Sequence, residues 1–488
     1  MIKPKSKNPI TLKESLVILS ASCASFMAPL DIYIVAIAAP SIARYFEISL
    51  NSVSLIMIVY TLVLTATIIF FGKLGDALGL KKIFILGYAI FTAASLMCAI
   101  SPTFYFLIFS RALQAIGGAM LYAMGLAIVP TYGAPEHKGF AYGISGMFAS
   151  LGMLVGAPLG GFLVEFLSWH WIFLINIPMG IFAIFISFYA LRKKVPKKVS
   201  LDFLGFILSS ITILLLFISL SLGQNIGWLS YQFLICVLSA FIFFGLFIFQ
   251  ESRAKEPLVA LKLFKNPVFC VSLLTIFLIY LPFSGFNFLF PFFLEDLKGF
   301  STNMAGVLLM FFGLTYLIFS PFLGKLSDKI SPIIFSIFGT IVISLSFLIF
   351  SFFIPNSNIF TIILFLIFFG FGFACFLTPI FNVVMSNVLP SYEGTGSALL
   401  RTASSFGLAI GLSFFQTIFC LLIPLKFSFS HTSKLSFALQ HYMQHAFQTV
   451  FITSAIIALI SFFLLLIVKL TKKETKKNSL ILKNKEKS

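Results

Sequence analysis

The chain has 488 residues, of which 60% are hydrophobic and only 10% are charged. A soluble domain carries roughly 25% charged residues, so this composition excludes an ordinary soluble protein. The formal net charge of +18 invites a nucleic-acid-binding interpretation, but the distribution of the basic residues along the chain argues against it.

Apolar stretches of the length that a bilayer requires, about 20 residues, follow one another along almost the whole chain. Backbone polar groups must be satisfied inside lipid, which favours helices. Alternating segments of about 10 residues, typical of membrane β-barrels, do not occur in the sequence. We therefore predict an all-α polytopic membrane protein. Fourteen spans are predicted, over residues 15–38, 53–71, 83–100, 103–126, 140–163, 171–191, 203–222, 231–249, 268–293, 304–323, 332–354, 359–388, 396–423 and 446–468.

Basic residues are concentrated in alternate loops. With the N-terminus inside, the inside segments hold 27 of the 33 Lys and Arg residues, and the outside loops hold four, Arg44, Lys298, Lys426 and Lys434. This asymmetry follows the positive-inside rule and predicts that both termini are cytoplasmic. The basic C-terminal tail is most simply a solvated end near anionic lipid, with a specific partner as the alternative.

A weak internal repeat divides the chain into halves. Residues 72–76, which read Gly-Lys-Leu-x-Asp, recur at 324–328, and three glycines of the fifth span match three of the thirteenth at nearly the same offset. Such duplication is typical of transporters, whose substrate site lies near the membrane midplane between the halves; a generic cytoplasmic turn is the alternative. The predicted parts are a cytoplasmic N-terminal segment (1–14), an N-terminal six-helix bundle (15–191), a linker with an inserted helix pair (192–267), a C-terminal six-helix bundle (268–468) and a basic cytoplasmic tail (469–488).

The loop after the second span contains residues suited to a conformational latch. Gly72 and Gly79 permit a tight turn, Asp76 can face the N-terminal end of the third span, and Lys81 or Lys82 can pair across the interface. This loop resembles the cytoplasmic signature of the major facilitator superfamily, and the whole chain resembles its fourteen-helix drug–proton antiporter branch. The resemblance implies the major facilitator fold and a partial second latch at Gly324 and Asp328. Ala77 and Leu80 stand where the family has basic residues, and an ordinary interfacial turn is the alternative.

Two ionisable residues lie deep inside predicted spans. Arg111 is about nine residues from the outer edge of the fourth span, which is near mid-membrane at ~1.5 Å per residue, and a cation there needs a partner or water. Asp31 of the first span can carry a proton, bind a cationic solute or form a buried pair with Arg111. Tyr33 can add an aromatic contact for a cation. The resemblance implies a role in proton coupling for Arg111, whose motif also contains Gln114.

The fifth span and the segment after it carry two further motifs. Small residues spaced four apart let helices approach closely, and proline bends a helix. The resemblance associates the first motif with antiport, although Ala157 separates its glycine from its proline, and close packing alone is the alternative. The first motif comprises Gly152, Gly156, Pro158, Gly160 and Gly161, and the second, a signature of the fourteen-helix branch, comprises Trp169, Trp171, Asn176, Pro178 and Gly180.

The remaining polar residues carry weaker signals. Glu165, Glu295 and Asp296 are expected at a solvated outer edge, with proton entry as the alternative. The six cysteines read as small buried hydrophobes. No metal site is predicted, and no phosphate loop, nucleophile elbow or paired catalytic carboxylates appear in the sequence. We therefore expect no enzyme activity and no cofactor, with the proton gradient as the energy source.

These observations predict a secondary transporter. The expected activity is proton-coupled efflux of small amphipathic or cationic compounds across the plasma membrane, or the inner membrane of a Gram-negative cell. Its expected partners are the small-molecule substrate, protons and the lipid bilayer, with no nucleic acid, and the protein is expected to act as a monomer. The alternative is a transporter of the same fold for a metabolite, siderophore or lipid, in either direction. A membrane enzyme or receptor is the third possibility.

Overall fold

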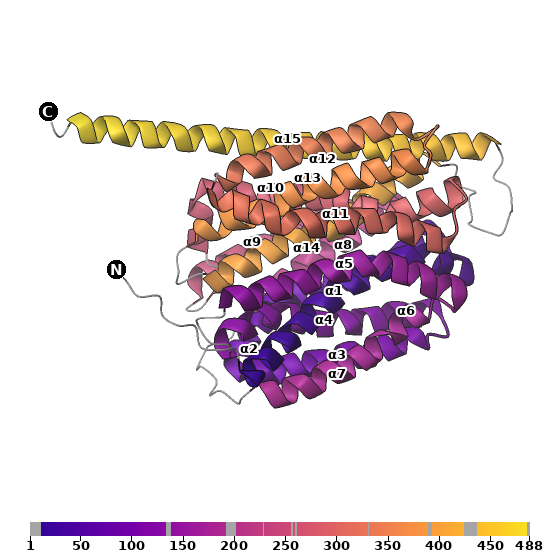
Figure 1. Cartoon of the computed structure of the whole chain (residues 1–488), viewed down its shortest axis with the longest axis horizontal. Coiled ribbons are helices and arrows are strands. Elements are labelled where there is room, and N and C mark those ends of the chain that lie inside the picture. The colour runs from indigo at the N-terminus through magenta and orange to yellow at the C-terminus, as the bar shows by residue number, and fades with distance from the viewer. Residues whose placement is uncertain are drawn as a thin grey trace. The chain divides into compact units, whose positions relative to one another are not determined.

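The computed structural model describes residues 11–132, 138–191, 202–227, 229–254, 257–258, 261–329, 331–388, 393–423 and 437–485. Within these ranges the regular structure is entirely helical (Figure 1). The elements are α1 (Leu12–Tyr45), α2 (Leu50–Leu78), α3 (Leu80–Ala99), α4 (Phe104–Tyr132), α5 (Lys138–Phe166), α6 (Trp171–Leu174), α7 (Asn176–Ala190), α8 (Phe203–Ile226), α9 (Tyr231–Arg253), η2 (Leu261–Lys265), α10 (Pro267–Phe292), η3 (Phe293–Leu297), α11 (Thr302–Lys329), α12 (Pro332–Phe353), α13 (Ile359–Ser386), α14 (Glu393–Leu421) and α15 (Phe437–Lys485).

The described helices match the predicted spans. Thirteen segments are long and apolar enough to cross a membrane, and the remaining predicted span, residues 203–222, is α8, whose apolar part is Phe203–Ser219. The sixth predicted span is divided into α6 and α7, and the ninth continues from α10 through η3 to Leu297. The prediction of an all-helical polytopic membrane protein is therefore confirmed.

Helix contacts divide the chain into two compact units. The first contains Met1–Leu258 and Asn287–Gly313, and the second contains Val259–Phe286, Leu314–Leu425 and Leu435–Ser488. The predicted inserted pair, α8 and α9, thus packs with the first unit. Helices α10 and α11 each contribute residues to both units, because the chain crosses from one unit to the other after Phe286 and again after Gly313.

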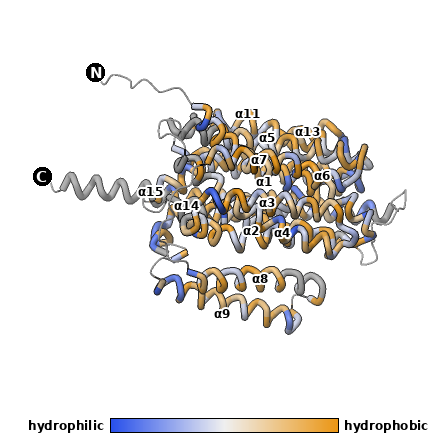
Figure 2. The backbone as a smooth tube through the Cα atoms, turned by 90° about the horizontal axis from the view of Figure 1, so that it is seen from below, coloured by the Kyte–Doolittle hydropathy of each residue, from blue (hydrophilic) through white to orange (hydrophobic). Residues whose placement is uncertain are grey.

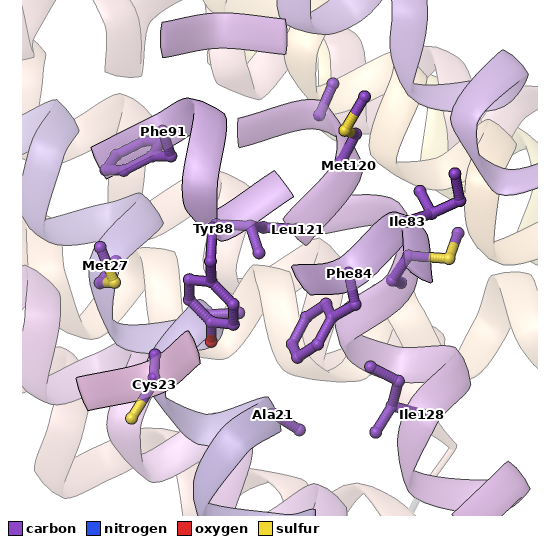
Figure 3. Packing of buried hydrophobic residues seen from close by; sticks show 14 of the residues in the cluster. Ala21, Cys23, Met27, Ile83, Phe84, Tyr88, Phe91, Met120, Leu121 and Ile128 are labelled. Atoms are coloured by element: carbon purple, nitrogen blue, oxygen red, sulfur yellow. The ribbon is translucent and has the colours of Figure 1, made fainter. Parts of the chain in front are cut away.

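A cluster of large apolar side chains forms a core of the first unit between α1, α3 and α4 (Figure 3). Phe84, Tyr88 and Phe91 of α3 are buried there with Met27 and Met120. The Tyr88 hydroxyl donates a hydrogen bond to the Ser20 carbonyl oxygen at 2.8 Å. This buried phenol is thus satisfied, as buried polar groups generally are.

The α8–α9 pair is a hairpin of apolar helices that run side by side (Figure 2). It contacts α2, where the Phe70 and Phe206 rings stack with centroids 4.0 Å apart. Much of α9 is exposed, including Phe241 at 67% and Leu238 at 62%. An apolar surface of this kind suits lipid, in agreement with a membrane protein.

Glycine contacts bring helices together in the same way in both units. In the first unit, Gly152 and Gly156 of α5 lie against α1, and a methyl group added at Gly152 would be 2.5 Å from the Phe26 carbonyl oxygen. In the second unit, Gly407 and Gly411 of α14 lie against α10, and a methyl group at Gly411 would be 2.5 Å from a carbonyl oxygen of α10. The sequence repeat thus corresponds to a repeated close helix contact, for which only glycine leaves room.

Candidate functional site

Asp31 lies in the middle of α1, and its carboxylate reaches two side chains of α4. Arg111 Nη1 donates to Asp31 Oδ2 at 2.8 Å, and Gln114 Nε2 donates to Asp31 Oδ1 at 3.0 Å. Arg111 Nη1 also donates to Gln114 Oε1 at 2.5 Å, and Gln114 Nε2 donates to Ser95 Oγ of α3 at 2.9 Å. We call Asp31, Ser95, Arg111 and Gln114 the coupling network. The structure therefore brings together three of the four residues predicted for the transport site.

Two aromatic rings cover the guanidinium group of this network. Arg111 Cζ is 4.2 Å from the centroid of the Tyr60 ring and 5.7 Å from that of the Phe173 ring. Arg111 Nε also donates to the Ile56 carbonyl oxygen at 3.4 Å. Aromatic faces attract cations, and more strongly when water is excluded. The arginine charge is thus stabilised by the rings as well as by Asp31.

The coupling network is buried and balanced in charge. Asp31 and Gln114 are fully buried, and Arg111 is 1% exposed. Both carboxylate oxygens of Asp31 accept a hydrogen bond, which is what a buried carboxylate requires. Of the options open for Asp31, the structure shows the buried pair with Arg111. A solute or a proton can reach this carboxylate only if the network is opened.

Tyr33 lies on another side of α1. A methyl group at Gly156 would be 2.8 Å from Tyr33 Cβ, so the Cβ of Tyr33 lies in the contact between α1 and α5. Tyr33 is 5% exposed. The tyrosine ring over Arg111 is that of Tyr60 of α2, and the predicted contact of Tyr33 with a cation stays a prediction. 

The predicted latch residues lie at the junction of α2 and α3. Gly79 ends α2 with φ of 99°, a conformation that favours glycine. Lys81 Nζ donates to the Leu191 carbonyl oxygen at 2.5 Å and to the Phe188 carbonyl oxygen at 2.7 Å. Lys81 thus caps the C-terminal end of α7, where a cation is favoured by the helix dipole.

The other predicted latch residues make no contact that the described part of the structure assigns to a latch. Lys82 is exposed and Gly72 has open space beside it, with nothing within 4 Å of an added methyl group. Asp76 lies in α2, and Gly324 and Asp328 lie in α11. The side-chain surroundings of these three residues lie outside the described part of the structure, so the latch role stays a prediction.

The small residues of α5 face two different helices. Gly152, Gly156 and Gly160 lie against α1, and a methyl group at Gly160 would be 2.5 Å from Ile37 Cγ2. Gly161 lies against α11, where the same test gives 2.6 Å to the Thr302 carbonyl oxygen. Pro158, within α5, follows Ala157, whose carbonyl oxygen contacts Gly306 of α11. The predicted packing motif thus holds α1 on one side and the beginning of α11 on the other.

The branch-signature residues surround the start of α6 and α7. Trp169 is 4% exposed and its ring lies 5.4 Å from that of Tyr45, whereas Trp171 is 46% exposed. Gly180 of α7 contacts Thr92 of α3. Pro178 is exposed in the first turn of α7, and Asn176 is fully buried with no hydrogen-bond partner for its amide among the described residues.

Three acidic residues expected at a solvated edge have defined partners. Glu165 Oε2 accepts a hydrogen bond from the Asn303 backbone N–H at 2.7 Å and so caps the first turn of α11. Arg44 Nη2 lies 2.9 Å from Glu295 Oε2, and its Nη1 lies 3.7 Å from Asp296 Oδ1. The Glu295 side chain is 5% exposed, so the expectation of a solvated edge is wrong for Glu295, whereas the Asp296 side chain is 18% exposed and keeps a partly solvated position.

The chain belongs to the Major Facilitator Superfamily, whose sequence profile matches residues 21–412. It is 34% identical over 429 residues to the riboflavin transporter RibZ of Clostridioides difficile (strain 630), covering 86% of this chain and 92% of that protein. It is 27% identical to the multidrug resistance protein Stp of Mycobacterium tuberculosis (strain ATCC 25618 / H37Rv), covering 82% and 74%. It is also 27% identical to the probable multidrug resistance protein EmrY of Escherichia coli (strain K12), covering 82% and 79%.

Solved structures agree on the fold. A bacterial homologue of the human lysosomal transporter Spinster has a TM-score of 0.66 at 15% identity, with 94% of this chain and 97% of that one covered. The protein is therefore a multi-pass membrane transporter of a small molecule and not an enzyme. The prediction of a major facilitator resemblance is confirmed.

Proposed function

We propose that the protein is a proton-driven secondary transporter of the plasma membrane that exports small, planar, amphipathic compounds. It acts as a monomer with both termini in the cytoplasm, and the proton gradient is its only energy source. The coupling network carries the proposal, because it contains a buried ion pair in the interior of the first unit.

Protonation of Asp31 would strongly raise the free energy of the conformation in which Asp31 and Arg111 are paired. Neutral Asp31 would leave Arg111 as a buried charge without its counter-ion, and breaking a buried pair in this way costs about 3–5 kcal/mol. The proton therefore binds together with a rearrangement that hydrates Arg111 or gives it another anion. A conformational equilibrium of a few kcal/mol is shifted by such a difference. This is how proton binding at Asp31 can drive the change between transport states.

A cluster of aromatic side chains in the second unit favours a planar, apolar solute. Phe373 and Phe283 stack with centroids 4.8 Å apart, and the half-buried Tyr280 and Tyr316 contact the same Phe373 ring at 5.9 and 5.8 Å. Aromatic rings bind flat ligands by stacking and attract cations to their faces. Residues 332–388 contain no charged side chain. Such surroundings favour neutral or cationic aromatic compounds over anionic ones.

Everted vesicles containing the protein test this proposal. With an acidic lumen, a fluorescent cationic dye should accumulate inside, and collapsing the proton gradient should release it. Asp31→Asn should abolish gradient-driven accumulation, whereas Glu14→Gln, which alters an exposed capping residue of α1, should leave it unchanged. Accumulation by Asp31→Asn at the native rate would overturn the proposal.

A flavin-like metabolite is the second candidate solute. The observation in its favour is the 34% identity to RibZ across most of both chains. The same vesicles distinguish the two candidates, because riboflavin and the dye can be supplied separately and in competition. The metabolite transporter would be favoured if the vesicles move riboflavin but not the dye, and if the rate of riboflavin movement does not depend on the direction of the proton gradient.

A further inference from the structure

One cluster of charged side chains, partly buried, is left unused by the proposed mechanism; the side chains of its arginine and two acids are 32%, 5% and 18% exposed. It lies where the end of α1 meets η3, and it consists of Arg44, Glu295 and Asp296. The Arg44 guanidinium also donates to Ser41 Oγ at 3.0 Å, which fixes its direction. All three residues lie in parts of the chain that belong to the first unit.

This cluster has one carboxylate more than it has cations. One arginine faces two carboxylates, so with both ionised the cluster carries a net charge of −1. Glu295 Oε1 and Asp296 Oδ2 are buried and have no hydrogen-bond partner among the described residues. A buried, unpaired anionic oxygen is costly, whereas a neutral carboxyl group is tolerated far better.

Three other polar side chains lie near the cluster. The Thr302 hydroxyl lies beside Glu295 and is neutral. Lys298, two residues after Asp296, holds its ammonium 5.7 Å from the centroid of the Phe293 ring, and burial lowers the pKa of Lys298 from its ordinary value. Glu165 is a further acid on the neighbouring α5, engaged in capping α11.

Close contacts between α5 and α11 begin beside the cluster at Thr302 and continue along α11. A methyl group at Gly306 would collide with the Ala157 carbonyl oxygen, and one at Gly313 would be 2.8 Å from Leu154 Cα. With Gly161 on Thr302, these contacts bring the two helices together along several turns. We call the ion-pair cluster and this α5–α11 contact together the outer lock, since the positive-inside asymmetry predicts that this end faces outside.

We propose that the outer lock takes up one proton, shared by Glu295 and Asp296, when it closes, and releases it when it opens. The inference rests on the proposed function in one respect, that the lock opens and closes during transport. Closing buries a cluster that is stable only when neutral, as one arginine, one carboxylate and one carboxyl group. Opening hydrates both acids, which then ionise.

The direction of the pH effect follows from proton counting. The closed lock binds one proton more than the open lock, so a lower external pH favours the closed lock. For one proton, the ratio of closed to open molecules changes by up to about tenfold per pH unit. A proton that binds to Glu295 or Asp296 from outside would thus favour closure of the lock, before any change in the protonation of Asp31.

Cysteine accessibility measures this equilibrium without any solute. Ala305 is fully buried and directly precedes Gly306, which contacts α5, so Ala305→Cys should react with a membrane-impermeant maleimide only when the lock is open. The parent chain gives the background from its six cysteines. Between about pH 8 and about pH 5.5, the labelling rate, corrected for reagent reactivity with an exposed Glu47→Cys reference, should fall severalfold.

Variants then locate the proton. Glu295→Gln should label slowly at every pH and lose most of the pH dependence, and Asp296→Asn should act in the same direction. Glu165→Gln removes an acid that joins α5 to α11 but does not belong to the cluster, so whatever its effect on the labelling rate itself, that rate should keep the native pH dependence. Arg44→Gln should label faster than the native chain, because two carboxylates would then face each other unpaired.

The inference fails if native labelling is independent of pH, or if Glu295→Gln and Asp296→Asn together leave the pH dependence intact. It also fails if Asp31→Asn abolishes the pH dependence, since the proton would then bind at the coupling network. These readouts do not require transport. A failure of the proposed drug export would therefore be seen separately, in the vesicle assay.

Discussion

The coupling network contains a fully buried ion pair and the outer lock a partly buried ion-pair cluster, and the two differ in charge balance. Asp31 faces one arginine, and both of its oxygens accept hydrogen bonds. Glu295 and Asp296 share one arginine, and each keeps an oxygen without a partner among the described residues. The first arrangement is neutral without a proton, and the second becomes neutral only with one.

This difference assigns distinct tasks to the two sites. A balanced pair holds its protonation state until it is broken, so it suits a group that changes only at one point of a transport cycle. An unbalanced cluster binds a proton as it closes, so its closing responds to external pH. The two sites would then act in sequence, with closure of the outer lock before any change at Asp31.

The largest effect is expected from removing one partner of the balanced pair. Arg111→Ala leaves Asp31 buried without a cation, and loss of about 3–5 kcal/mol in the free energy of unfolding is expected. The double variant Asp31→Asn with Arg111→Gln should recover much of this stability, because no buried charge remains. Thermal unfolding of the purified protein in detergent measures both, and a double variant no more stable than Arg111→Ala would show that the pair is not balanced as described.

A smaller effect is expected from forcing the outer lock apart. Gly161→Val places side-chain atoms against the Thr302 carbonyl oxygen, which a single methyl group would already approach to 2.6 Å. Overpacking of this kind costs about 1–3 kcal/mol and should raise the labelling rate of Ala305→Cys.

Gly245→Val is the matched control for this change. Gly245 lies in α9, and nothing is found within 4 Å of a methyl group added there. It should leave labelling unchanged. Equal labelling of Gly161→Val and the native chain would mean that the α5–α11 contact does not keep Ala305 buried.

The coupling network was largely predictable from the sequence, and the outer lock was not. Charge is so scarce inside the spans that Asp31 and Arg111 stand out, and their pairing was one of the options considered. Glu295 and Asp296 lie at a predicted helix end, where solvation is the ordinary state of an acid. Their burial depends on η3 extending α10 beyond the predicted end at 293, and on Arg44, 251 residues away from Glu295 in the sequence.

The aromatic cover of Arg111 could not be chosen from the sequence either. The chain has 65 phenylalanines and 14 tyrosines, so composition cannot single out Phe173 and Tyr60. Helix α6 positions Phe173, and the break before α7 was hidden inside one predicted span. Tertiary contacts select these rings, and periodicity along one helix does not contain that information.

Replacing Tyr60 tests whether its ring stabilises the charge of Arg111. The Tyr60 hydroxyl has no hydrogen-bond partner among the described residues, so Tyr60→Phe should be nearly neutral for stability. Tyr60→Leu removes the ring face, and a desolvated cation–π contact is worth about 2 kcal/mol. Phe84→Leu, another buried ring in the same unit, reports the loss of packing alone. If both leucine variants lose equal stability, the ring over Arg111 contributes only packing.

The smallest effect is expected at Lys81, which separates a structural cap from a moving latch. Lys81→Gln weakens the hydrogen bonds to the end of α7, and a cation at a helix C-terminus is worth about 0.3–1 kcal/mol. Lys81→Arg should keep this contribution, and Lys82→Gln, at an exposed neighbour, should change nothing.

The free energy of unfolding and the labelling rate of Ala305→Cys should be measured together. If Lys81 only caps α7, Lys81→Gln leaves the labelling rate unchanged. If Lys81 is part of a latch, its loss shifts the equilibrium between the transport states and so changes the fraction of molecules whose outer lock is open. A changed labelling rate in Lys81→Gln would therefore contradict the assignment of Lys81 as a cap.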